Sequence, residues 1–113
     1  MISMRAALAC ATVVVLSGCV SQASYDTSRE ALRGSPALRT DFINNCVSNI
    51  SRKSLAQRQA MAKLMNTSVR NTPSVYCRRV TNGITSGRMT RDDMNAAARG
   101  QVTPAAVRVL QGR

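Results

Sequence analysis

The chain has 113 residues, with 16 Lys and Arg against five Asp and Glu, one Phe, two Tyr and no Trp. This length allows one domain at most, with a thin core of Leu, Val, Ile, Met and Ala. The sequence contains no His, the commonest general base and metal ligand, and has few carboxylates. We therefore expect a non-enzymatic protein with no catalytic residue, metal or other cofactor. Its net charge of +11 favours anionic partners.

Residues 1–18 have the three parts of a secretory signal peptide. A basic start at Arg5 precedes the apolar run from Ala6 to Leu16. That run is shorter than the about 20 apolar residues that a membrane-spanning helix needs. It ends in Leu16-Ser17-Gly18-Cys19, where two small residues stand directly before a cysteine. We expect residues 1–18 to be removed when the chain is exported.

The four residues Leu16, Ser17, Gly18 and Cys19 resemble the lipobox of bacterial lipoprotein signal peptides, and the likeness covers residues 1–19 only. It implies recognition of these four residues by signal peptidase II, cleavage before Cys19 and attachment of diacylglycerol to the Cys19 sulfur. Because Val20 follows in place of Asp, it also implies sorting to the outer membrane, facing the periplasm. A type I signal-peptidase site at Ser21-Gln22-Ala23 is an alternative, and would release a soluble periplasmic protein.

Residues 19–34 are predicted to form a lipidated N-terminus and a flexible tether, because the segment is polar and rich in Ser. At most, a frayed helical turn is expected around Ser28–Arg33. Residues 35–113 are predicted to form one small helical domain.

Helix-start signals recur along that domain. Ser35-Pro36, Thr72-Pro73 and Thr103-Pro104 each place an N-cap residue before a proline. Ser54 with Gln57 and Thr90 with Asp93 resemble capping boxes. Apolar residues at three- and four-residue steps follow these signals. The sequence therefore predicts an all-α bundle of four to five short helices, over residues 36–52, 54–65, 73–86, 91–99 and 104–111.

Cys46 and Cys77 are the two cysteines beyond residue 19. In a chain that is exported to an oxidising compartment, an even pair predicts a disulfide. It would join the first helix of the domain to the third and close a loop of about 31 residues, which contributes on the order of 3.5 kcal/mol. The bundle is thus predicted to be stapled by one disulfide.

The basic residues are the best lead to a binding site. They lie in two groups, which a disulfide between the two helices would bring to one side: Arg52, Lys53, Arg58 and Lys63, and then Arg70, Arg78, Arg79 and Arg88. The candidate anion-binding residues among them are Arg52, Lys53, Arg58, Arg78, Arg79 and Arg88. Guanidinium groups bind phosphate and carboxylate, so anionic lipid, lipopolysaccharide or an envelope protein are the expected partners. The scarcity of aromatic residues argues against nucleic acid. Four methionines offer soft ligands for copper(I), but more often such residues fill a small core: Met61, Met65, Met89 and Met94.

Taken together, these features predict a membrane-attached envelope lipoprotein that acts as a structural or interaction module. Two alternatives remain open. One is a small helical stress or chaperone-like protein of the periplasm, although a chain without His and with five acidic residues has few groups for an acid trigger. The other is an accessory lipoprotein of a secretion or conjugation machine.

Overall fold

The computed structural model describes residues 20–113, and within this range the chain is all-helical. Six helices follow one another: α1 (Gln22–Gly34), α2 (Pro36–Ser51), α3 (Leu55–Met65), α4 (Thr72–Ser86), α5 (Arg91–Ala98) and α6 (Pro104–Leu110). The predicted all-α fold is confirmed, whereas the predicted count of four to five helices is wrong. The additional helix is α1. The predicted signal peptide and Cys19 lie outside the described residues.

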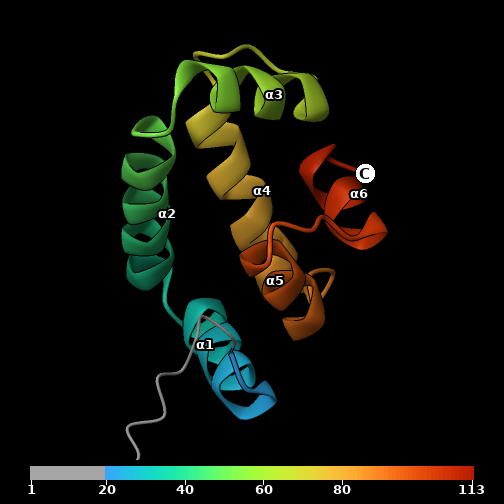
Figure 1. The fold of residues 1–113 in the computed structure, drawn as a ribbon. Helices are drawn as coiled ribbons and strands as arrows, with labels where there is room; N and C mark the ends of the chain where they lie inside the picture. Colours follow the sequence, from blue (N-terminus) through green and yellow to red (C-terminus); the bar gives the residue numbers. More distant parts are fainter. Residues whose placement is uncertain (1–19) are drawn as a thin grey trace, which may run out of the picture.

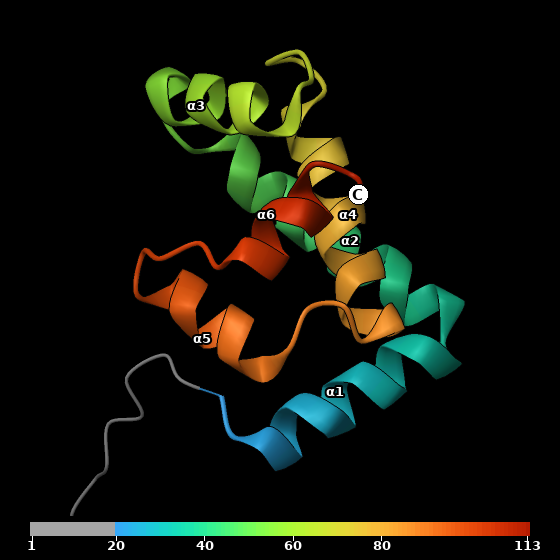
Figure 2. The same cartoon turned by 90° about the vertical axis from the view of Figure 1, so that its right-hand side faces the viewer.

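Helix α4 is the centre of the domain, since α1, α2, α3 and α6 all pack against it. Helix α2 runs antiparallel beside α4, and α3 crosses the end where α2 finishes and α4 begins (Figure 1). Helix α6 lies on the other side of α4 from α2. Helices α1 and α5 lie at the opposite end of the molecule from α3 (Figure 2).

The helix boundaries follow local capping chemistry. Ser35, Ser54, Thr90 and Thr103 each accept a hydrogen bond from the backbone N–H three residues further on, as the sequence predicts. The prediction is wrong by one residue at α4. There Thr72 is already helical, and its hydroxyl donates to the carbonyl of residue 68 at 2.9 Å.

The segment that the sequence assigned to a flexible tether is largely helix α1. Its Tyr25 and Leu32 side chains are only 6% and 4% exposed and belong to the core. The Tyr25 hydroxyl donates to the carbonyl of Met89, in the loop between α4 and α5. Tyr25 and Leu32 are seven residues apart, about two helical turns, so they lie on the same face. The segment is clearly amphipathic at helical spacing. Its polar, Ser-rich composition predicted a tether instead, and this helix was therefore missed.

The core lies between α1, α3, α4 and α6. Its buried members are Tyr25, Leu32, Met65, Val80, Ile84, Met89, Ala106, Val109 and Leu110. Helix α2 adds nothing to this cluster, although its apolar residues recur at helical spacing. Ile50 is its only buried residue, while Leu38 and Phe42 are 41% and 36% exposed. A periodic apolar face therefore did not predict burial in α2.

Two features hold α2 in place. Cys46 of α2 and Cys77 of α4 lie at disulfide distance, with their sulfur atoms 2.14 Å and their Cα atoms 5.7 Å apart. At the start of α2, Arg39 Nη1 donates to the carbonyls of Leu32 and Arg33, at 2.7 and 3.0 Å. These carbonyls lie in the last turn of α1, where they lack helical partners. The predicted cysteine pair is thus brought together, and it links the helices that the sequence indicated.

Candidate functional site

The first described residue is held against the folded domain. The Val20 backbone N–H donates to Asn95 Oδ1 at 2.9 Å, and Asn95 Nδ2 donates back to the Val20 carbonyl at 3.1 Å. One side-chain amide on α5 therefore satisfies both backbone polar groups of Val20. Directly after it, Ser21 caps α1 by accepting from the Ser24 N–H at 3.1 Å. We call this arrangement of Val20, Ser21 and Asn95 the N-terminal junction.

Helix α5, which provides Asn95, is positioned by the buried carboxylate of Asp93. This carboxylate accepts hydrogen bonds from the Thr90 N–H at 2.8 Å and from the Thr103 hydroxyl at 2.6 Å. Burial alone raises the pKa of Asp93, but the hydrogen bonds from Thr103 and Thr90 outweigh it and hold the pKa below its usual value. Because Thr90 caps α5 and Thr103 caps α6, Asp93 ties the starts of both helices together.

Two arginines flank Asn95 in the sequence, at the two ends of α5: Arg91 is its first residue and Arg99 its C-cap residue. Arg91 and Arg99 stand four residues before and four residues after it, which is the spacing of side-chain neighbours on a helix. Arg91 pairs with the neighbouring Asp92 at 2.8 Å, whereas Arg99 is exposed at the end of the helix. The N-terminal junction therefore has basic side chains on both sides. Sequence reasoning missed this group, because it becomes a site only where Val20 meets α5.

The first group of predicted anion-binding residues lies at the corner between α2 and α3. Arg52 ends α2, and its guanidinium donates to the Asn49 side chain of the same helix. Arg58 Nε donates to the carbonyl of Lys53 at 3.1 Å, which fixes the turn between the two helices. Two members of this group therefore make local structural contacts.

Arg79 of α4 has a structural role that the sequence did not reveal. Its Nη1 donates to the carbonyl of Met65 at 3.1 Å and to that of Leu110 at 2.6 Å. These two residues are the last of α3 and of α6, where carbonyl groups lack helical partners and positive charge is favourable. One guanidinium group thus joins two helix ends that are distant in sequence.

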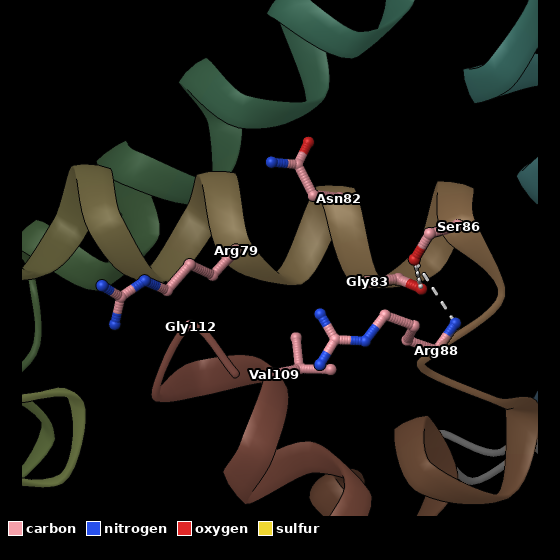
Figure 3. Close-up of a pocket in the computed structure, with 7 residues that line it drawn as sticks. All are labelled: Arg79, Asn82, Gly83, Ser86, Arg88, Val109 and Gly112. Carbon is pink, nitrogen blue, oxygen red and sulfur yellow. Dashed lines mark hydrogen bonds between the residues drawn. The ribbon is translucent and has the colours of Figure 1, made fainter.

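A basic cleft of about 250 Å³ lies between α4 and α6, and Figure 3 shows its lining. Arg79 reaches past Gly112 towards α3, while Arg88 runs back along the cleft beside Val109 (Figure 3). Their guanidinium groups therefore lie at different points of the cleft. Asn82, between them on α4, also lines it.

The six predicted anion-binding residues do not form one site. Arg79 and Arg88 line the basic cleft, and Arg78 lines an adjoining pocket with Arg79. Lys53 lines a separate apolar groove, while Arg52 and Arg58 line neither cleft nor groove. The basic surface is therefore divided among the α2–α3 corner, the basic cleft and the N-terminal junction.

Side chains that could hold a metal ion are dispersed over residues 20–113. In that range no three His, Cys, Asp or Glu side chains lie together in a way that would hold a metal ion. The four methionines considered as copper ligands pack in or against the core: Met61, Met65, Met89 and Met94. None of the described helices is both long enough and apolar enough to span a membrane.

Comparison with known proteins gives no family assignment. No family model, no curated protein and no solved structure matches the chain. The function must therefore be argued from its own residues and geometry.

Proposed function

We propose that this chain is a lipid-anchored lipoprotein of the bacterial envelope, and that its helical domain is a non-enzymatic interaction module held directly at the membrane surface. The resemblance of Leu16–Cys19 to a lipobox supports the anchor. The two hydrogen bonds between Val20 and Asn95 support the proposed orientation of the domain relative to the membrane. A lipid on Cys19 would be attached one residue away, about 3.8 Å along the chain from Val20. No flexible spacer would then separate the lipid from the domain.

The proposed membrane-facing surface is the face of α5 around the N-terminal junction. Arg91 and Arg99 flank Asn95 at the two ends of α5, so they would lie at the level of the lipid headgroups. A basic residue near an anionic membrane contributes about 1 kcal/mol of attraction. Two or more acyl chains hold a protein to a bilayer far more strongly than this. The anchor therefore supplies affinity, and the arginines orient the domain towards anionic lipid or lipopolysaccharide, in the outer membrane facing the periplasm.

The anchor is tested by replacing Cys19 with Ser in cells that are fed labelled palmitate. The expected result is loss of the label from the protein and loss of the protein from the membrane fraction. Cys10→Ser is the matched control, since Cys10 lies in the segment that would be removed, and this variant should keep both properties. Unchanged labelling of Cys19→Ser would overturn the proposal.

The orientation is tested with vesicles and the chain 20–113, which carries no lipid. Binding to phosphatidylglycerol vesicles should exceed binding to phosphatidylcholine vesicles and should fall as salt is added. Arg99→Ser should weaken this binding by about fivefold, the equivalent of one basic residue at the surface. Arg70→Ser removes the same charge from the loop at the α3 end and should have a smaller effect. Equal effects of the two variants would contradict an α5-facing orientation.

A further inference from the structure

An apolar groove is lined by residues of α3, α4, α5 and α6. Its volume is about 260 Å³, and its lining includes Met61, Leu64, Tyr76, Met89, Met94 and Leu110. Dry cavities of about 150 Å³ already bind benzene. The groove is therefore large enough for part of a hydrocarbon chain. It is a different surface from both the basic cleft and the N-terminal junction.

Three polar side chains line this mainly apolar groove: Lys53, Tyr76 and Gln101. Lys53, from the α2–α3 turn, lines it, and no carboxylate side chain shares the lining. Tyr76 of α4 also lines it, and burial raises the pKa of its hydroxyl. The other tyrosine, Tyr25, donates its hydroxyl to a carbonyl, whereas Tyr76 makes no hydrogen bond with another residue in the range 20–113. A free hydroxyl donor and a cation beside an apolar surface complement a ligand with a hydrocarbon tail and an anionic head.

We propose that the groove binds a medium-chain fatty acid, with its tail among the methionines and its carboxylate at Lys53 and Tyr76. Methionine suits this role because its flexible, polarizable side chain adapts to a mobile chain. Each buried methylene group contributes about 0.8 kcal/mol. Val102, which is 54% exposed at the edge of the groove, would be covered by the bound tail. This inference goes beyond the proposed function and does not require a lipid on Cys19.

The test uses decanoate, below its micelle concentration, with the chain 20–113. This chain includes all six helices, the buried core and the Cys46–Cys77 pair. Calorimetry should show saturable binding of one decanoate per chain. Lys53→Met should weaken binding about tenfold, because it removes a charged donor to the carboxylate. Tyr76→Phe removes a neutral donor and should weaken binding by a smaller factor. Lys63→Met is the matched control, because Lys63 is exposed on α3 and does not line the groove.

A second pair of variants tests the location. Ala97→Trp should block the groove from its rim and abolish binding, whereas Ala98→Trp should leave binding unchanged. Both alanines are exposed on α5, but only Ala97 lines the groove. The proposal is overturned if decanoate does not bind, if decanol binds equally well, or if Ala97→Trp still binds. It is also overturned if the chain dimerises through this groove and thereby excludes decanoate. Because the chain tested lacks Cys19, failure here would leave the proposed anchor untouched.

Discussion

Helices α2 and α6 both pack against α4, but they are held there by different means. Helix α6 has seven residues and buries Ala106, Val109 and Leu110 in the core. Helix α2 has 16 residues and buries only Ile50. What α2 lacks in buried area is replaced by the cysteine pair to α4 and by the contacts of Arg39 with the end of α1. A thin core thus stabilises one side of α4, and the Cys46–Cys77 pair, at disulfide distance, links α2 to the other side.

The largest expected effect comes from breaking that link. Cys46→Ser should lower the free energy of unfolding by about 2–5 kcal/mol, because the loop between the two cysteines is no longer closed. Amide exchange should speed up mainly in α2, while α6 remains protected, since α6 does not depend on the link. Urea denaturation and hydrogen exchange measure the two effects. Cys77 is fully buried in the fold, so alkylation is compared in denaturant without reductant, where Cys77 of this variant should become reactive. Equal reactivity of Cys77 in the parent chain would show that no disulfide exists.

A second substitution disturbs the packing of α6 on α4 instead. A methyl group added at Gly83 of α4 would lie 2.6 Å from Met89 Cγ and 2.8 Å from Val109 Cγ1. Gly83→Ala should therefore destabilise the fold by about 1–3 kcal/mol through overpacking, although alanine is the better helix former. Thermal unfolding measures this loss. Gly34→Ala is the control, since nothing lies within 4 Å of its added methyl group. A gain in stability from Gly83→Ala would contradict the close packing of α6 on α4.

The contrast between α2 and the rest also shows what the sequence could predict. The starts of α3, α5 and α6 were predicted because each cap and its partner lie within three residues of each other. Such signals survive in any tertiary context. Burial cannot be predicted in this way. The apolar residues of α2 recur at helical spacing, but they are buried only where another element packs on them. Leu38 and Phe42 have no such cover among residues 20–113 and remain partly exposed.

The site was less predictable than the fold for a related reason. The hydrogen bond from Tyr25 to Met89 spans 64 residues, and the contact between Val20 and Asn95 spans 75. Nothing in the sequence near either residue indicates which distant residue it will contact. The same holds for Arg79, whose acceptors are carbonyl groups left free at the ends of two other helices. The number of basic residues favours an anionic partner, but it does not show which of these residues make structural hydrogen bonds within the fold.

A smaller change in stability is expected when the pH is lowered, and it should arise at the starts of α5 and α6, which Asp93 ties together. In the unfolded chain Asp93 has its ordinary pKa, about 3.9, whereas the folded chain holds that pKa lower. The resulting stabilisation is complete above about pH 5 and is lost as the pH falls through the folded value. Asp93→Asn should cost about 1–2 kcal/mol at neutral pH, and this difference from the parent should shrink in acid.

Denaturation of the two chains at a series of pH values measures this difference. Thr103→Val removes one donor to the Asp93 carboxylate, so it should raise the pKa of Asp93 and move the acid transition to higher pH. Parallel pH profiles for the parent and Asp93→Asn would contradict the role given to this carboxylate.

The smallest effect on stability is expected at the N-terminal junction. In the chain 19–113 with Cys19→Ser, Asn95→Ala removes both hydrogen bonds to Val20 at an exposed position, so it should cost less than about 1 kcal/mol. The Val20 N–H should then exchange rapidly, whereas the amides of α2 and α6 should not change. Asn82→Ala, at an exposed position on α4, is the matched control and should leave Val20 protected.

Unchanged protection of Val20 in Asn95→Ala would show that Asn95 does not hold the junction. Under the proposed anchoring, the same variant has a consequence out of proportion to its free energy. Releasing Val20 would insert a flexible connection between the lipid and α1, so the domain would lose its fixed orientation while keeping its fold and its anchor. The weakest contact tested here would thus decide which surface of the domain faces the membrane.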